Sequence, residues 1–385
     1  MSQAADLDAM HAVPAGKVQA LAPWLQTQLE SLLVQRGHAW ILGGPSGLGQ
    51  FELALALARA WLCEAATPQG ACNHCSSCHA VDVHTHADLC VLMPEILSLA
   101  LGWPLDEKTQ DDLDAKKRKP SKEIKVDAAR EVVSFTQFTR SRGTTKVVLV
   151  FPAERMNHIT ANTLLKTLEE PPGAVKFILA TEAVHQLLPT IRSRCIGHGM
   201  IWPDFGQALA WLQTESARQG EGEAAAKTAA KTQRNPSTAD LRTLLVAAGG
   251  RPADALAWAR NTPASDAAQH WQALPKAMAL GDVSALSGWA PGEAVVALQK
   301  LCHDVLAVRM GASPRFFAAQ DMTFPAGMAP GQTSGAVRAS DAGMQALATW
   351  AKELATSART VEHPYNPGLM LEFLVSRAKL ALNAK

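Results

Sequence analysis

The sequence lacks a long hydrophobic run, since no apolar stretch approaches the roughly 18 residues that a membrane-spanning helix needs. Its first residues also lack a basic segment followed by an apolar core, which is the pattern of an ordinary signal peptide. These absences argue against a membrane span and a secretory leader. We therefore expect a cytoplasmic protein with no membrane partner.

An excess of charge of either sign is missing too, because 36 Lys and Arg stand against 35 Asp and Glu. This balance argues against a protein that coats nucleic acid over its whole surface, although it permits a local basic patch. With 385 residues, 48% of them hydrophobic, the chain can build about two or three domains with their own cores.

The first 200 residues alternate short apolar runs with amphipathic stretches, whereas the strand signal ends at Pro203. This alternation predicts an α/β fold with a parallel sheet covered on both faces, followed by helices. The expected strands are 39–42, 89–92, 147–150 and 177–180, and the expected helices include 51–62, 127–139, 160–169, 241–259, 294–310 and 369–382. Residues 104–122 and 214–238 lack apolar periodicity and are predicted to be poorly ordered surface insertions. The basic run 116–122 is interpreted as a solvated loop rather than a DNA contact.

A glycine-rich loop with Gly44, Gly47 and Gly49 follows the first expected strand and precedes a helix. This is the arrangement of a phosphate-binding loop, whose backbone N–H groups converge on phosphate oxygens. Such a loop also needs Lys for the β- and γ-phosphates and Ser or Thr for Mg²⁺, but Gln50 and Phe51 stand at those positions. We interpret the loop as a degenerate nucleotide site rather than a stray glycine turn.

The segment after the third expected strand lacks a second part of an ATPase site. An active ATPase with such a phosphate-binding loop places an acidic pair directly after that strand. This chain has Pro152 and Ala153 there, and Glu154 comes one residue late. The chain is therefore expected not to hydrolyse ATP and not to be an enzyme on its own.

Four of the seven cysteines, Cys63, Cys72, Cys75 and Cys78, fall within sixteen residues. Clustered thiols in a cytosolic chain more often bind metal than form disulfides. Four thiolates match the tetrahedral preference of structural Zn²⁺ and leave no open position for catalysis. An iron–sulfur cluster and reduced free thiols are the alternatives.

Five features appear in a distinctive order: the loop Gly44 to Gly49, the four cysteines, Val126 to Val132, Asn162 to Pro172 and Ile191 to Cys195. In this order they resemble the clamp-loader family of bacterial DNA polymerase III, and within it the delta-prime branch. The resemblance implies an AAA+ module in three parts. They are an α/β domain over 1–200 with the zinc module 63–78, a helical lid over 201–262 that carries the insertion 214–238, and a helical collar over 263–385.

The family's Ser-Arg-Cys motif falls on Ser193, Arg194 and Cys195, which implies that Arg194 acts as an arginine finger in trans. A guanidinium stays charged and makes bidentate contacts, so it can stabilise charge on a γ-phosphoryl group of a neighbouring subunit. The alternative is a surface arginine that caps a helix end. Thr181 resembles a relic of the first sensor position, and Ala253 falls where active subunits carry a second sensor arginine; Arg251 is out of register.

The resemblance implies a non-catalytic subunit of the clamp loader, within a DNA-directed DNA polymerase holoenzyme. It would scaffold a pentamer with gamma/tau and delta subunits, which loads the sliding clamp on primed DNA. One alternative is an active ATP-hydrolysing subunit of the gamma/tau type, against which Gln50, Phe51 and Pro152 argue. The other is a zinc-containing DNA-binding module, which the near-neutral charge opposes.

Overall fold

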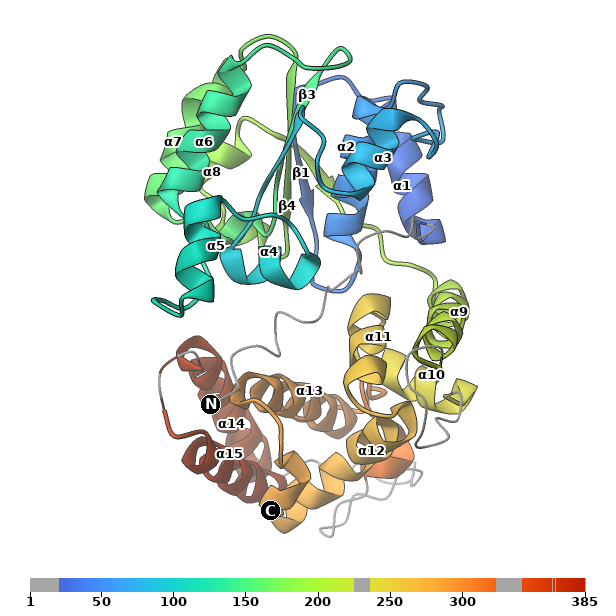
Figure 1. The fold of residues 1–385 in the computed structure, drawn as a ribbon. Coiled ribbons are helices and arrows are strands. Elements are labelled where there is room, and N and C mark those ends of the chain that lie inside the picture. Colours follow the sequence, from blue (N-terminus) through green and yellow to red (C-terminus); the bar gives the residue numbers. More distant parts are fainter. Residues whose placement is uncertain (1–20, 225–235, 323–340, 362, 364, 385) are drawn as a thin grey trace. The chain divides into compact units, whose positions relative to one another are not determined.

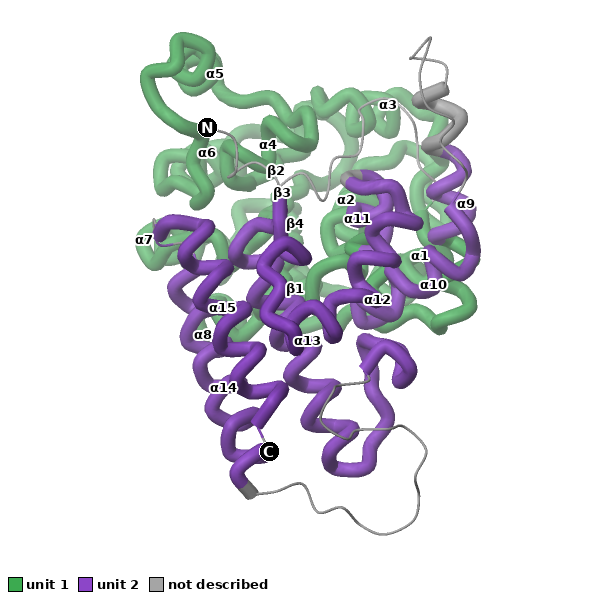
Figure 2. The backbone as a smooth tube through the Cα atoms, turned by 90° about the horizontal axis from the view of Figure 1, so that it is seen from below, with its two compact units in different colours: residues 1–211, 251–254 green, residues 212–250, 255–385 purple. Residues whose placement is uncertain are grey.

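The structure is a computed structural model that describes residues 21–224, 236–322, 341–361, 363 and 365–384. The chain divides into two compact units, which Figure 2 shows in different colours. Unit 1 contains residues 1–211 and 251–254, and unit 2 contains residues 212–250 and 255–385. Among the described residues, no helix is both long and apolar enough to cross a bilayer.

A five-stranded parallel sheet lies at the centre of unit 1 in the order β2-β3-β4-β1-β5 (Figure 1). The strands are β1 (Ala39–Gly43), β2 (Leu89–Leu92), β3 (Lys146–Val150), β4 (Val175–Thr181) and β5 (Ile196–Gly199). The four predicted strands are confirmed. The fifth was not predicted because Ile196–Gly199 is short, carries two glycines and is mostly exposed, so it lacks the continuous apolar run of a buried parallel strand.

Between residues 21 and 192, the described part of unit 1 contains the helices α1 to α8. They are α1 (Pro23–Leu33), α2 (Gln50–Leu62), α3 (Ser76–Asp82), α4 (Glu95–Leu101), α5 (Glu107–Asp114), α6 (Val126–Gln137), α7 (His158–Glu169) and α8 (Pro189–Arg192). In Figure 1, α1, α2 and α3 lie on one side of the sheet and α6, α7 and α8 on the other. The expected sheet with helices on both faces is therefore confirmed.

The alternation of side chains along the strands explains the two layers. Trp40 and Leu42 of β1 pack in one core with α1 and α2, whereas Ile41 packs in a second core with α6 and α7. Successive side chains of a strand point to opposite faces, so apolar residues at every position give each face its own core. This arrangement fixes the carboxyl ends of β1, β3 and β4 at one edge of the sheet.

Helices alone follow Pro203 within the described part of the chain, as the sequence predicts. They are α9 (Phe205–Ala224), α10 (Thr238–Ala247), α11 (Pro252–Asn261), α12 (Ala264–Leu280), α13 (Pro291–Arg309), α14 (Asp341–Thr360) and α15 (Pro367–Leu382). The predicted helix 241–259 is two helices, because Gly249 and Gly250 both adopt positive φ angles between α10 and α11. In unit 2, α13, α14 and α15 pack around a core that includes Trp350 and Leu298.

The prediction that both insertions are poorly ordered is wrong in part. Residues 104–122 contain α5, which begins where the Asp106 side chain accepts a hydrogen bond from the Thr109 backbone N–H. Charged residues hide this helix from an apolar-periodicity test, because no α5 side chain is buried. In the second insertion, α9 continues to Ala224 and α10 begins at Thr238, while residues 225–235 lie outside the described residues.

Candidate functional site

The glycine-rich loop lies between β1 and α2, where the sequence places it. Gly49 adopts a φ of 94° as the residue before α2, and a Cβ there would lie 2.6 Å from Leu25 Cδ1. Only glycine combines this backbone angle with this close approach. The loop therefore has the strand–glycine–helix frame of a phosphate site.

The side chain of Gln50 occupies the inside of the loop. It is 3% exposed, and its amide nitrogen donates hydrogen bonds to Gly44 O at 2.6 Å and to Pro45 O at 2.7 Å. Phe51 is buried in the core, with its ring 5.2 Å from that of Phe151. Both replaced positions thus serve the protein's own packing and hydrogen bonding.

Two side chains cover the loop from the segment that returns to unit 1, and both contact Ser46 of the loop. Arg251 Nη1 donates to Ser46 Oγ at 2.8 Å, Ser46 Oγ donates to Asp254 Oδ2 at 3.1 Å, and Arg251 forms an ion pair with Asp254 at 2.9 Å. We call Ser46, Arg251 and Asp254 the loop clasp. The clasp places a guanidinium and a carboxylate at the loop together, so their charges offset and the pair supplies no net positive charge for a phosphate.

Gly47 shows how closely the clasp approaches the loop. Its φ is +75°, and a Cβ there would lie 2.5 Å from Asp254 Oδ1. The neighbouring Ala253 N–H donates to Gly47 O at 3.2 Å. The sequence analysis recognised Arg251 and Ala253 only as a lost sensor and missed Asp254, whose signal was its place in the first turn of a helix that begins with Pro252.

Glu154 and Thr181 lie at the same edge of the sheet. Thr181 is fully buried, and its hydroxyl donates to Glu154 Oε2 at 2.6 Å. The other oxygen of Glu154 accepts the Glu182 backbone N–H at 3.1 Å. Both carboxylate oxygens therefore hold the ends of β3 and β4 together.

The four cysteines meet at one point between α2 and α3. Cys63 follows α2, Cys75 precedes α3, and the Sγ atoms of the four residues all lie within 4.8 Å of one another. The Sγ atoms of Cys63 and Cys75 are 3.8 Å apart, and those of Cys72 and Cys78 are 4.0 Å apart. A tetrahedron with Zn–S bonds of about 2.3 Å has sulfur separations of about 3.8 Å. The donor set and its spacing therefore fit a structural zinc ion.

Backbone N–H groups direct positive dipoles at two of the sulfur atoms, with Cys72 N 3.2 Å from Cys63 Sγ and Cys78 N 3.4 Å from Cys75 Sγ. Burial opposes ionisation of Cys75, but N–H groups of Cys78 and Glu64 outweigh it and lower its pKa to about 6. Burial raises the pKa of Cys78 to about 12. A bound cation would favour the thiolate form of all four residues.

Arg194 follows α8 and is held at the surface. Its Nε donates to Glu169 Oε1 at 2.5 Å, its Nη2 forms an ion pair with the same oxygen, and its Nη1 donates to Thr190 O at 2.7 Å. The Arg194 side chain is 31% exposed. The contact with Thr190 is the helix-end contact that the alternative interpretation predicts.

The two other residues of the motif support the turn that carries Arg194. Ser193 ends α8 and its hydroxyl donates to Thr190 O at 3.1 Å. Cys195 packs against the core of the α6–α7 face, and burial raises its pKa to about 12. The role of Glu169 as a partner of Arg194 was not predicted, although Glu169 lies within the segment Asn162 to Pro172.

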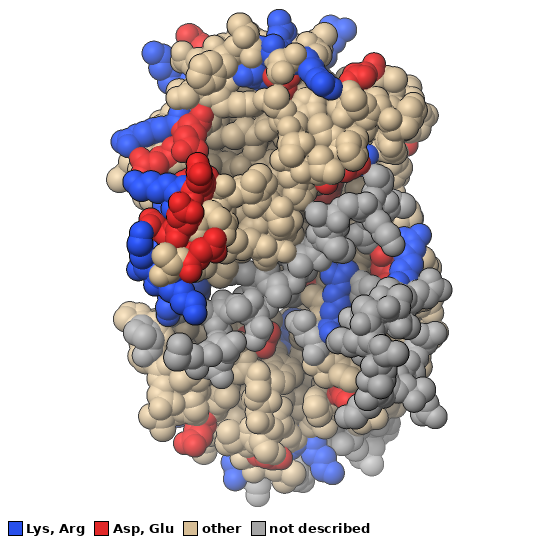
Figure 3. Space-filling view, viewed as in Figure 1, with Lys and Arg blue, Asp and Glu red and all other residues tan. Residues whose placement is uncertain are grey.

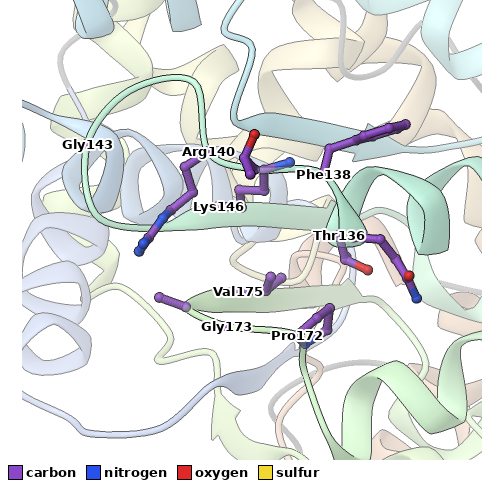
Figure 4. A pocket seen from close by; sticks show the side chains of 11 residues that line it. Thr136, Phe138, Arg140, Gly143, Lys146, Pro172, Gly173 and Val175 are labelled. Carbon is purple, nitrogen blue, oxygen red and sulfur yellow. The ribbon is translucent and has the colours of Figure 1, made fainter.

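A cavity of about 590 Å³ lies at the opposite edge of the sheet, where β3 and β4 begin (Figure 4). Lys146 lines it and is 3% exposed, with Nζ donating to Phe135 O at 2.7 Å near the end of α6. A cation at a helix C-terminus is satisfied by the carbonyl groups and the helix dipole. None of the predicted site residues lines this cavity.

Residues 20–198 match the family described as DNA polymerase III, delta subunit. The chain is 36% identical over 192 residues to a DNA polymerase III subunit delta' from Pseudomonas aeruginosa, covering 49% of this chain and 52% of that protein. The corresponding subunit from Escherichia coli is 36% identical over 200 residues, covering 50% and 52%. The chain thus spans about half the length of the curated relatives it matches. Over that half, the predicted resemblance to delta-prime subunits is confirmed.

Two further comparisons are weaker. A DNA polymerase III subunit gamma from Buchnera aphidicola is 33% identical over 159 residues, covering 41% of this chain and 37% of that protein. The crystal structure of a gamma subunit-related protein from Thermotoga maritima is 16% identical and aligns with a TM-score of 0.42 over 94% of this chain and 100% of that chain.

Proposed function

Because residues 20–198 match the DNA polymerase III delta subunit family and the same half resembles delta-prime subunits, we propose that this chain is a non-catalytic clamp-loader subunit of the delta-prime type. It would work beside gamma/tau and delta subunits in a cytoplasmic pentamer that loads a sliding clamp on primed DNA. The observation that carries the proposal is the glycine loop, whose interior is filled by the protein's own side chains.

The loop supports the absence of ATP hydrolysis in three ways. Gln50 uses its amide on the loop's own carbonyl groups, and Phe51 offers no hydroxyl for Mg²⁺. Asp254 offsets the charge of Arg251 beside Gly47. Both carboxylate oxygens of Glu154 accept hydrogen bonds, one from the Thr181 hydroxyl and one from the Glu182 backbone N–H. A nucleotide would have to displace the loop clasp without gaining a lysine or a metal ligand.

Arg194 supports a role in trans. It directly precedes β5, which runs parallel to β1, so it lies where β5 begins, whereas the glycine loop follows the opposite end of β1. Glu169 contacts its Nε and Nη2 atoms and Thr190 contacts Nη1, so the guanidinium is oriented while still partly exposed. We propose that it meets the γ-phosphate on an adjacent subunit, with Ser193 and Cys195 shaping its turn.

The proposed zinc ion has a structural role. Cys63, Cys72, Cys75 and Cys78 would fill all four tetrahedral positions, so the ion would hold the end of α2 against the start of α3. Outside this set, Glu64 accepts hydrogen bonds from the Ser76 and Ser77 hydroxyls at 2.8 and 3.0 Å. These bonds would fix the segment that carries Cys75 and Cys78.

Unit 2 offers a surface for assembly. On α15, Leu369, Phe373 and Leu380 are 65%, 51% and 61% exposed, and their spacing of four and seven residues places them on one face of the helix. We propose that this face packs against sister subunits in the collar. The collar would comprise residues 263–385, after an AAA+ domain over 1–200 and a lid over 201–262.

The proposal is tested by mixing the purified chain with gamma/tau and delta subunits and measuring assembly by size-exclusion chromatography, together with ATP turnover by each component. The expected result is co-elution in one complex and no turnover by this chain alone. Turnover of ATP by the isolated chain would favour the alternative, an active subunit of the gamma/tau type. The similarity to a gamma subunit supports that alternative. Failure to enter the complex would contradict the assignment as a subunit.

A further inference from the structure

The insertion 104–122 ends in a basic turn that the proposed function does not use. From Lys116 to Lys125 the chain carries six cations and one acid, Glu123. Figure 3 shows Lys and Arg beside Asp and Glu along this edge of unit 1, with positive side chains gathered at the lower end of α5. We call Lys116, Lys119 and Lys122 the basic tip, because all three are exposed there.

A buried carboxylate fixes the turn that carries the basic tip. Glu95 is 9% exposed and accepts hydrogen bonds from Arg118 at 2.5 and 3.1 Å, from Lys125 at 2.5 Å and from the Ser121 backbone N–H at 2.9 Å. Burial alone would raise the pKa of Glu95, but these partners lower it to about 2. Two of the six cations, Arg118 and Lys125, therefore anchor the turn through Glu95.

The cations that remain are displayed outward. Lys117 forms an ion pair with Asp112 at 3.1 Å, whereas the three residues of the basic tip form no ion pair within the part of the chain that the structure describes. Lys116 has a φ of 53°, in the left-handed region that non-glycine residues seldom adopt. Backbone bonds from Lys116 and Lys117 to Leu113 and Asp112 hold this conformation.

The chemistry of the tip selects its ligand. Its charges are ammonium groups, which act as point charges toward phosphate oxygens. The sequence from 116 to 122 has no aromatic residue for stacking on a base and no Asn or Gln for reading a base edge. This composition favours contact with the phosphate backbone of duplex DNA, without preference for sequence.

The acidic side of α5 limits how far a polyanion can extend. Asp111 and Asp114 are exposed on the helix that leads into the tip, and they would repel phosphates that run along it. We propose that the basic tip of this chain binds the backbone of duplex DNA directly, through about three phosphates. This contact goes beyond the proposed function, which requires DNA only through the assembly, and it is a property of the chain alone.

The test is fluorescence anisotropy of a short labelled DNA duplex titrated with the isolated full-length chain at several salt concentrations. Each neutralised phosphate contributes a slope of about −0.9 to log K against log salt, so three contacts predict a slope of about −3. Lys116→Gln, Lys119→Gln and Lys122→Gln together should remove most of that slope and weaken binding by about tenfold or more at low salt. A duplex of different sequence should bind equally well.

Two matched variants make the test specific. Replacing the exposed residues Lys166, Lys276 and Lys352 by Gln removes the same charge elsewhere and should leave the affinity within about twofold of wild type. Changing Asp111 and Asp114 to Asn should tighten binding, since it removes the repulsion beside the tip. Circular dichroism confirms that each variant is folded.

The proposal is overturned if the tip variant binds the duplex with an unchanged salt slope. It is equally overturned if the control variant loses as much affinity as the tip variant, because the attraction would then be diffuse. Preferential binding of a polyglutamate peptide, abolished by the tip variant while DNA binding persists, would assign the tip to an acidic protein partner instead. None of these outcomes depends on ATP turnover or on pentamer formation.

Discussion

The glycine loop and the Arg194 turn are both made of phosphate-binding chemistry, yet they use it in opposite ways. In the loop, Gln50 donates to the loop's own carbonyl groups and the Arg251–Asp254 pair lies over Gly47. At the turn, Arg194 is oriented by Glu169 while its side chain stays 31% exposed. Both side chains have partners inside the protein, so the two sites differ in exposure: Gln50 is 3% exposed and closed off, whereas Arg194 is oriented by its partners and remains accessible from solvent.

Removal of zinc should have the largest effect on stability. The helix α2 follows the glycine loop at one end and is followed by Cys63 at the other, so the proposed zinc ion holds the helix that carries the loop. Cys72→Ser with Cys78→Ser should reduce bound zinc from about one ion per chain to nearly none. Structural zinc ions contribute on the order of 10 kcal/mol in small domains, so thermal unfolding should shift to a markedly lower temperature. Metal content is measured by atomic absorption.

The matched control for that experiment is Cys90→Ala, which removes a thiol outside the cluster. It should keep a full complement of zinc. Equal zinc in the double serine variant and the wild type would contradict the assignment of the ligands.

The carboxylates that hold Arg118 and Arg194 differ in burial, because the Glu95 side chain is 11% exposed and the Glu169 side chain is 45% exposed. The pKa of Glu95 is lowered from 4.5 to about 2, so the folded state gains stability above about pH 4.5 and loses it as the pH falls toward 2. Glu95→Gln should lower the free energy of unfolding at pH 7 by about 2–3 kcal/mol. It should also flatten the stability profile over that acidic range.

The measurement is urea unfolding of the wild type and the variant between pH 7 and the lowest pH at which both refold. Parallel pH profiles for the two proteins would show that Glu95 is not the group that titrates.

Asp254→Ala tests the clasp directly. Arg251 and Ser46 would lose a shared partner, and the free energy of unfolding should fall by about 1–2 kcal/mol. A double-mutant cycle with Arg251→Ala should give less than the sum of the single effects, because the two side chains contact each other. Strict additivity would mean that the clasp contributes nothing as a unit.

Glu169→Gln should have the smallest effect on stability, below about 1 kcal/mol, because exposed ion pairs contribute little. Urea unfolding provides the value. A loss of unfolding free energy as large as that of Glu95→Gln would mean that the Glu169–Arg194 ion pair is structural, like the Glu95–Arg118 pair.

The sequence predicts the frame of the molecule better than its contacts. The strand ending at Val150 and the loop at Gly44 to Gly49 follow from local apolar runs and glycine spacing, because such signals depend on neighbouring residues. The cysteine cluster follows from its spacing for the same reason.

The clasp could not be predicted, since Ser46 and Asp254 are 208 residues apart and meet only through the fold. The sequence did not predict α5 because the helix has no buried apolar face and begins at the Asp106 cap, while Glu95 holds the turn that follows it. The pairing of Glu169 with Arg194 likewise depends on how α7 and α8 pack. The roles of Arg194 and the zinc ion stay predictions.

The measurement that tests the central claim most directly is ATP turnover by a reconstituted loader that carries Arg194→Ala or Arg194→Lys, beside the chain alone. The account predicts no turnover by the chain alone and a loss on the order of 10³-fold at the one site that receives the arginine, with little rescue by lysine. Turnover by the isolated chain, or an unchanged rate in the Arg194→Ala assembly, would contradict it.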